Sequence, residues 1–390
     1  MDNRLRKRAI LSCIMIFQMM LLNACTGNHA ATQRNEAAPP STSLNTEAIM
    51  GTQHIQKTLD TNLSVDADVS VPAAKEYSSY LTNIKSFSAD DMSKLFLQQD
   101  TSKQTLSKVD YDPNGLNIKT ENGSQITSFM GSLTYSSNSD REAGIASLIS
   151  SYAVQYPESP AFTDHLTFAS REDAIKEGAG ILEKLDAGFL PSAKNVLALT
   201  HNQLSDWQTS LLQDPDYKTF VDAGKAKVID DWSGDDDVYY IIYSFKQDDL
   251  QVYNQQIEPG ISLAADSLPP RSMYAEMLIS PKGIQYLNIN GSLSIKGQAA
   301  SNPIISSDAA LEKVKEKYSQ LILSTPYTIT KAFVEYIPIP DSSELSANTK
   351  ITLTPYWCFV IKITTDDKGH TAEIAERFNA WTGADLKYGG

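Results

Sequence analysis

The chain has 390 residues, of which 41% are hydrophobic and 9% aromatic, and its formal net charge at pH 7 is −14. This length and hydrophobic content are typical of a globular protein of about two domains. The excess of acidic residues argues against nucleic acid as a partner, because phosphate binding depends on Lys and Arg side chains.

The N-terminus has the order of a secretory signal peptide. Residues 4–8 carry four basic side chains, residues 9–22 are largely apolar, and Ala24 precedes Cys25. The apolar run is too short for a membrane-spanning helix, and polar sequence follows it at once. The ending Leu22-Asn23-Ala24-Cys25 resembles the lipobox of bacterial lipoproteins.

The resemblance implies that residues 1–24 are a lipoprotein signal peptide and that Cys25 receives a diacylglyceryl group. Two acyl chains anchor a protein stably, whereas one chain binds a membrane only marginally. Loss of the leader removes four basic residues and one acidic residue, so the net charge becomes about −17 and no basic patch assists the anchor. We expect a protein anchored by lipid to the extracytoplasmic face of a bacterial membrane. The alternatives are an ordinary signal peptide with a chance cysteine, or a cytosolic apolar helix.

Cysteine usage agrees with this interpretation. Cys13 is lost with the leader and Cys25 is acylated, so Cys358 remains alone and no intramolecular disulfide is possible in the mature chain. Residues 356–361 are predicted to form a strand, in which Cys358 is a buried structural thiol.

Residues 25–61 are rich in Thr, Asn, Ala, Gln, Ser and Pro and are predicted to be a disordered tether. An N-terminal α+β region follows at residues 62–165. It begins with a strand at 63–71, where apolar and polar residues alternate. It also contains a turn at 112–115 and helices that start at Ser88 and Ser139.

The rest of the chain is predicted to form two modules, at residues 166–300 and 301–390, that share a plan of a helix followed by antiparallel strands. The first has a helix capped by Ser170 and ended at Gly188, a helical pair at 204–212 and 217–223, and strands at 238–245, 273–279 and 284–289. The second has a helix capped by Ser307 and strands at 327–337, 351–363 and 372–380. The predicted fold class is α+β, with two helix-plus-antiparallel-sheet modules. Whether the modules are true repeats is left open.

Residues 356–360 and 378–385 resemble the end of a PepSY-like module, in which one strand begins with an aromatic residue and the next ends in an Asn-Ala-x-Thr-Gly turn. The YycH and YycI accessory proteins, which lie outside the membrane and restrain a sensor kinase, share this architecture. The likeness covers residues 304–390. It implies a helix packed on an antiparallel sheet, and a turn in which Gly383 takes a positive φ.

We expect the helix of the second module to face its sheet with four apolar side chains, Leu311, Val314, Tyr318 and Leu321. Adjacent residues of a strand point to opposite faces, so only one of Trp357 and Cys358 can lie under this helix.

More broadly, the leader, the tether, the strand at 65–69 and the helix start at 86–91 resemble a family of uncharacterised lipoproteins from Gram-positive gut bacteria. That family has no known function, so the resemblance implies no activity.

The sequence lacks the usual catalytic signatures: a nucleophile elbow, a Ser-x-x-Lys pair, a zinc-binding His-Glu-x-x-His helix and a phosphate-binding loop. Gly178 and Gly180 lack the third glycine of a dinucleotide fingerprint, and we predict a close helix contact there. The histidines stand alone, and nothing in the tether is expected to hold His54 in place. We therefore predict no catalytic residues, no metal site and no cofactor.

One dense carboxylate cluster stands out, formed by Asp230, Asp231, Asp235, Asp236 and Asp237. Five carboxylates beside a flexible Gly234 could supply oxygen ligands to extracellular Ca²⁺. The cluster lacks the alternating Asp-x-Asp-x-Asp-Gly order of an EF-hand, and it lacks the distant Glu of that motif. The interpretation that the sequence favours is a solvated loop before a strand, whose charges discourage edge pairing.

Tyrosine is abundant, with 18 residues, and six gather in the strands of the first module: Tyr239, Tyr240, Tyr243, Tyr253, Tyr274 and Tyr286. Aromatic side chains on a sheet can form a binding face for a peptide, a glycan or a protein. They also pack well as ordinary strand residues.

These features predict a lipid-anchored extracytoplasmic protein without enzymatic activity. It would bind or regulate another component of the cell envelope, a protein or a peptide. The alternatives are a substrate-capturing lipoprotein of a transporter, which usually shows repeated βαβ units, and an envelope hydrolase, which needs a nucleophile or a metal set.

Overall fold

The computed structural model describes residues 51–386, apart from 73, 99–101, 110–111, 139–140, 156–164, 187, 225, 258–270, 343–345, 347 and 366–369. The predicted leader, Cys25 and most of the tether lie outside the described residues. The fold is α+β, as the sequence predicts, with 48% strand and 23% helix. Among the described residues, no helix is long and apolar enough to cross a membrane.

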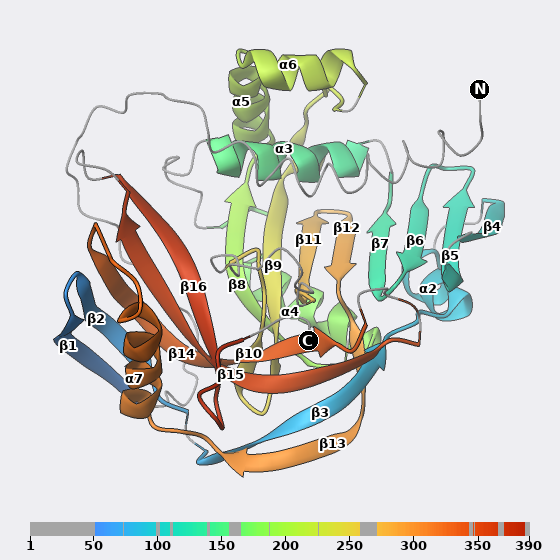
Figure 1. The fold of residues 1–390 in the computed structure, drawn as a ribbon. Helices are drawn as coiled ribbons and strands as arrows, with labels where there is room; N and C mark the ends of the chain where they lie inside the picture. Colours follow the sequence, from blue (N-terminus) through green and yellow to red (C-terminus); the bar gives the residue numbers. More distant parts are fainter. Residues whose placement is uncertain are drawn as a thin grey trace, which may run out of the picture. The chain divides into compact units, whose positions relative to one another are not determined.

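Sixteen described strands join in one mixed sheet (Figure 1). Hydrogen-bonded neighbours follow the order β13-β3-β15-β14-β10-β9-β11-β12-β7-β6-β5-β4, and β1, β2, β8 and β16 pair beside this path. The strands are β1 (Thr52–Asp60), β2 (Leu63–Ser70), β3 (Glu76–Ile84), β4 (Gln104–Val109), β5 (Asp112–Thr120), β6 (Gln125–Phe129), β7 (Ser132–Ser136), β8 (Leu190–Leu199), β9 (Val238–Gln247), β10 (Leu250–Val252), β11 (Tyr274–Ser280), β12 (Gly283–Asn290), β13 (Leu293–Pro303), β14 (Tyr327–Pro340), β15 (Lys350–Thr364) and β16 (Thr371–Asn379).

Serine side chains begin three of the helices. The Ser88 and Ser170 hydroxyls each accept a hydrogen bond from the backbone N–H three residues later, as predicted. The third cap is Ser306 rather than the predicted Ser307, because the Ser306 hydroxyl accepts the hydrogen bond from Ala309 N. The helices are α2 (Ala89–Phe96), α3 (Arg141–Gln155), α4 (Arg171–Lys184), α5 (His201–Leu211), α6 (Pro215–Asp222) and α7 (Ser307–Tyr318), with a 3₁₀ helix, η2, at Gly234–Asp236.

The predicted tether is wrong at its C-terminal end. Residues 52–60 form β1, which pairs with β2 in antiparallel register from Thr52 opposite Ser70 to Asp60 opposite Leu63. Most side chains of β1 are exposed, so the strand lacks the alternation that identifies β2. Strand structure therefore begins inside the segment whose composition predicts a tether.

The predicted division at residues 165 and 300 does not separate compact units. Ile49–Ile149 and Pro160–Gly390 form one unit, and a second unit holds Met1–Ala48 and Ser150–Ser159. Strands of the N-terminal region pair with both modules: β2 and β3 pair with β14 and β15, and β7 pairs with β12. The short β10 pairs with β9 on one side and β14 on the other, so the two modules share one sheet.

The predicted turn at 112–115 is also wrong. Asp112 opens β5, and its carboxylate accepts hydrogen bonds from Asn114 N at 2.9 Å and Met130 N at 2.7 Å. Val109 lies opposite Asp112, so Asp112 already belongs to the pairing of β5 with β4. The polar residues that suggested a turn instead tie the start of β5 to the end of β6.

The second module follows its predicted plan. Leu311, Val314 and Tyr318 of α7 belong to the main hydrophobic core together with Trp357, whose indole N–H donates to the Ile305 carbonyl at 3.1 Å. Cys358 is buried on the opposite side of β15. One of the two adjacent residues thus faces the helix, as expected.

One expectation for this module, the burial of Leu321, is wrong, and another, the positive φ of Gly383, is confirmed. Leu321, expected to face the sheet, is 56% exposed because α7 ends at Tyr318. Gly383 has φ +69°, as the turn prediction requires. The preceding Asn379 side chain accepts hydrogen bonds from the backbone N–H groups of Trp381 and Thr382, at 3.0 and 3.1 Å, and so holds the turn.

Candidate functional site

Four of the five aspartates in the cluster bind neighbouring cations or backbone groups, and Asp230 is exposed. Arg141 lies between two of them: its guanidinium binds both oxygens of Asp236, at 2.9 and 2.8 Å, and Asp231 Oδ1 at 2.7 Å. Asp235 pairs with Lys282 at 2.8 Å. Asp237 Oδ1 accepts from His201 N at 2.7 Å, at the start of α5.

These contacts change the interpretation of the cluster. Asp236 is buried rather than solvated, and the Arg141 guanidinium opposes the effect of that burial, so the pKa of Asp236 lies below its ordinary value. Burial raises the pKa of the neighbouring Glu142 to about 7, and the Asp236 charge adds to the effect. The described residues contain no group of three or more side chains placed to hold a metal ion. The ion pair of Asp236 with Arg141 therefore connects η2 to the start of α3.

We therefore expect Ca²⁺ to leave the stability of this protein unchanged. A cation would have to displace Arg141 and Lys282 from carboxylates that they already neutralise. Melting temperatures measured with millimolar Ca²⁺ and with a chelator should agree. A midpoint that rises with Ca²⁺ concentration would contradict this expectation, since a ligand bound only by the native state stabilises it.

Two histidines of the described part of the chain lie beside carboxylates, and one of them is His201, whose Nδ1 is 2.7 Å from Asp237 Oδ1. His54, expected to have no fixed place, lies on β1 between Asp68 and Asp66, with its ring nitrogens 2.9 and 3.1 Å from their carboxylates. Bonding to Asp68 raises the pKa of His54. All three side chains are exposed, so this cluster is a surface feature of the β1–β2 hairpin.

The six tyrosines that the sequence groups together lie on different faces. The hydroxyl of Tyr239 donates to the Ala169 carbonyl at 2.9 Å, and that of Tyr243 donates to the Ile175 carbonyl at 2.8 Å, so both face the core at α4. Tyr253 packs in a separate buried cluster, with the Arg377 guanidinium 4.9 Å from its ring centroid. The other three, Tyr240, Tyr274 and Tyr286, lie on the opposite face of the sheet, by strand register.

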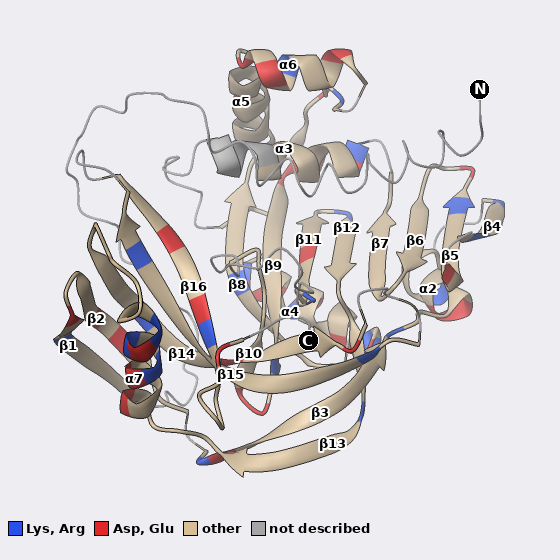
Figure 2. Cartoon of the chain, viewed as in Figure 1, with Lys and Arg blue, Asp and Glu red and all other residues tan. Residues whose placement is uncertain are grey.

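That opposite face carries a continuous row of polar side chains. Residues directly opposite each other in neighbouring strands share a face, and the register aligns one polar residue from each of β11, β12, β7, β6, β5 and β4. Figure 2 shows no charged residue on β7 and β6, whereas β11 carries an acidic residue and β5 and β4 carry charged residues. The row, called the polar row below, consists of Glu276, Asn288, Thr134, Thr127, Asn117 and Ser107.

Side-chain hydrogen bonds order one end of the polar row. Asn288 donates to Glu276 Oε2 at 3.3 Å and accepts from Thr134 Oγ1 at 3.4 Å. Thr127 accepts from the Gln125 amide at 3.1 Å. Asn117 Oδ1 is buried and accepts no hydrogen bond within the described part of the chain. Burial raises the pKa of Glu276, the single ionisable group in the row.

Aromatic rings flank the polar row on both sides. One neighbouring row contains Tyr274, Asn290, Ser132 and Phe129 in register, and the Ser132 hydroxyl donates to Asn290 Oδ1 at 3.2 Å. On the other side, Tyr286 lies opposite Ser136. A face that combines amides, hydroxyls and ring surfaces can bind a ligand by hydrogen bonds and stacking.

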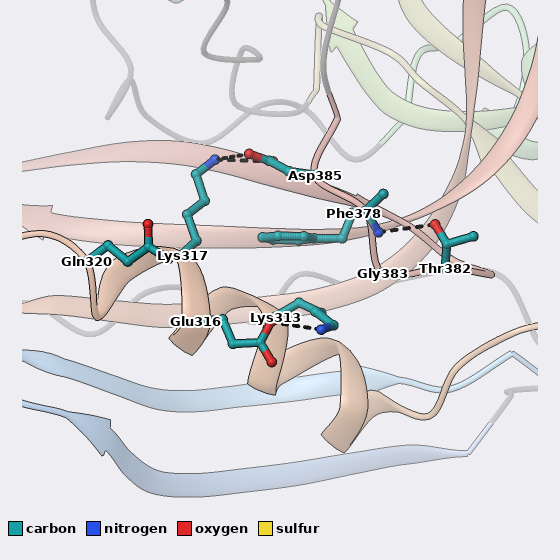
Figure 3. A pocket seen from close by; sticks show the side chains of 9 residues that line it. Lys313, Glu316, Lys317, Gln320, Phe378, Thr382, Gly383 and Asp385 are labelled. Atoms are coloured by element: carbon teal, nitrogen blue, oxygen red, sulfur yellow. Dashed lines mark hydrogen bonds and ion pairs between the residues drawn. The ribbon is translucent and has the colours of Figure 1, made fainter.

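A hollow lies between α7 and the turn after β16 (Figure 3). It has a volume of about 330 Å³, and its lining includes Lys313, Lys317, Phe378 and Thr382. Its lysines are neutralised within the protein: Lys313 pairs with Glu316 at 2.8 Å, and Lys317 with Glu376 and Asp385 at 2.7 and 3.0 Å. The hollow is therefore charge-balanced, and we assign no ligand to it.

Comparison with known proteins identifies a fold but no activity. No protein-family model matches the sequence, and no curated protein matches it. The structure is similar to the crystal structure of an uncharacterised protein from Eubacterium rectale, with a TM-score of 0.56 and 14% sequence identity. The likeness covers 86% of this chain and 94% of that one. At this identity the likeness shows the fold alone.

Sequence reasoning missed the polar row although all six residues are visible in the sequence. Each occupies the polar side of an ordinary strand, and the strands come from three separate stretches, 104–136, 274–280 and 283–290. A signal exists within one stretch, where Ser107, Asn117, Thr127 and Thr134 recur in successive short strands. The register needed to align them depends on long-range pairing of β7 with β12.

Proposed function

We propose that this chain is a lipid-anchored extracytoplasmic protein without enzymatic activity that binds another component of the cell envelope through the polar row. The observation that carries the proposal is the alignment of six polar side chains across six neighbouring strands. The PepSY-like and lipoprotein resemblances of the sequence are consistent with a binding or regulatory role. Among the described residues, no group of three or more His, Cys, Asp or Glu side chains is placed to hold the metal ion of a metal-dependent hydrolase.

The experiment that tests binding uses the full chain, produced in a Gram-positive bacterium and extracted in mild detergent. The protein is mixed with purified cell walls and sedimented. We expect it to sediment with the walls, and we expect Asn117→Ala/Thr127→Ala to reduce the retained fraction. The matched control Asn302→Ala/Thr371→Ala changes exposed residues of β13 and β16 and should bind like the unaltered chain. Equal retention of all three proteins would contradict the proposed site.

The anchor is tested separately with Cys25→Ala. If Cys25 carries the diacylglyceryl group, the variant should lose labelling by a fatty-acid analogue and leave the membrane fraction or remain unprocessed. Cys358→Ala is the control for loss of a thiol that is buried in the fold. A Cys25→Ala protein that is still labelled and bound to the membrane would contradict the lipid anchor.

A further inference from the structure

We propose that the first turn of α3 is a pH-sensitive contact, which holds while Glu142 is protonated and loosens when Glu142 ionises near neutral pH. The inference goes beyond the proposed function and does not depend on the polar row. Three observations lead to it: the burial of the Glu142 carboxyl group, the engagement of the neighbouring cations with other carboxylates, and the place of this turn in the fold.

The Glu142 carboxyl group is buried without a counter-ion. Glu142 lies in the first turn of α3 and is 8% exposed. In the described part of the chain, no donor forms a hydrogen bond with its carboxyl group and no cation pairs with it. Asp236 is also buried, and its charge opposes a second one on Glu142. A buried carboxylate without a partner costs far more free energy than the neutral acid, so the fold favours the protonated form.

The cations around Glu142 are engaged elsewhere. Arg141, the preceding residue, directs its guanidinium to two aspartates in and before η2. Lys282, between β11 and β12, pairs with Asp235, and its side chain is 61% exposed. Both cations lower the pKa of Glu142, but burial and the Asp236 charge outweigh them and raise it to about 7.

The proton on Glu142 links the stability of the folded chain to pH. The ordinary pKa of a glutamate is 4.5, and that of Glu142 in the folded chain is about 7. Between these values the folded chain holds a proton that the unfolded chain has lost. Stability therefore falls as the pH rises through this window and levels off above it. One such proton changes the folding equilibrium by up to about tenfold per pH unit.

The contact secures the start of α3 and not the whole helix. Ile145 and Ile149 of the same helix are fully buried, so apolar packing holds α3 beyond its first turn. An ionised Glu142 would compete with Asp236 for Arg141, whose ion pair connects this turn to η2. We therefore expect the start of α3 to open before the rest of the chain as the pH rises.

The test compares urea denaturation of the full chain and of Glu142→Gln, both in mild detergent, from about pH 5 to about pH 8. Glutamine has the size of glutamate but cannot ionise. We expect Glu142→Gln to become steadily more stable than the unaltered chain up to about pH 7, and the difference to be constant above it. Glu121→Gln, at an exposed position between β5 and β6, is the matched control, and its difference from the unaltered chain should not change with pH.

The comparison is made at each pH because other groups also titrate in this range. Asp237, which follows η2, binds His201 Nδ1 of α5 at 2.7 Å, and histidine side chains change charge near neutral pH. This pair is present in all three proteins, so its contribution cancels in the differences. A difference between Glu142→Gln and the unaltered chain that is constant from about pH 5 to about pH 8 would overturn the inference.

Hydrogen exchange of the unaltered chain is a second test, which does not require Glu142→Gln to fold. After correction for the intrinsic effect of pH on exchange, the protection of residues 141–149 should fall by about tenfold or more between about pH 5 and about pH 8. Protection that stays constant over this range would overturn the inference, whatever the behaviour of the variant.

Discussion

Gly178→Ala should destabilise the protein, whereas Gly180→Ala, two residues along the same helix, should stabilise it. Gly178 is buried in α4 against β9 and β11, and a Cβ there would overlap Tyr243 Oη and lie 3.0 Å from Met277 Sδ. Nothing lies within 4 Å of a Cβ at Gly180. Alanine is preferred to glycine in a helix by about 1 kcal/mol, so the sign of each effect depends on the space available.

We expect Gly178→Ala to lower the free energy of unfolding by about 1–3 kcal/mol, the usual range for an overpacked core. Gly180→Ala should raise it by about 0.4–1 kcal/mol. Urea denaturation of the two variants and the unaltered chain measures both values. Stabilisation by Gly178→Ala would contradict the close packing of α4 on the sheet.

A third variant assigns the effect to the tyrosine hydroxyl. Tyr243→Phe removes the oxygen that a Cβ at Gly178 would overlap, and also the hydrogen bond to the Ile175 carbonyl at 2.8 Å. In a double-mutant cycle, Gly178→Ala should be less destabilising by about 1 kcal/mol or more when it is combined with Tyr243→Phe than when it is made alone. Additive effects would mean that the two residues do not meet.

The contact at Gly178 illustrates what the sequence predicts well. Each element recognised from the sequence combines a cap or a turn residue with apolar periodicity, as at Ser170 or in the alternating β2. These signals involve residues that are close in sequence, so they can be recognised without knowledge of the tertiary structure. The predicted helix contact at Gly178 follows from the same periodicity, because the glycine falls on the apolar face of the helix.

Most of the errors concern strands that are defined by their pairing partners and not by alternation of their own side chains. Polar β1 and most of β13 have exposed side chains, so no alternation identifies them, and their strand conformation is fixed by the partners β2 and β3. The joining of two predicted modules into one sheet depends on three-residue β10. The polar row has the same origin, because a register across six strands cannot be derived from any one of them.

Leu311→Ala in α7 should have the largest effect on stability. Leu311 of α7 is fully buried in the main hydrophobic core. The same core contains Val314 of α7 and Trp357 of β15. Removal of a buried leucine side chain leaves a cavity and typically costs about 2–5 kcal/mol. The total stability of a domain is about 5–15 kcal/mol, so this loss approaches the threshold of unfolding.

Leu321→Ala is the matched control, because the same atoms are removed from a side chain that is 56% exposed beyond the end of α7. We expect its free energy of unfolding to change by less than about 0.5 kcal/mol, as is usual for surface positions. Thermal and urea denaturation of the two variants compare the effects directly.

Leu311→Ala also tests whether the two predicted modules unfold together. The sheet on which α7 packs is the same sheet that carries the polar row. A single cooperative transition at lower temperature is the expected result, and two separated transitions would show that the modules are independent after all.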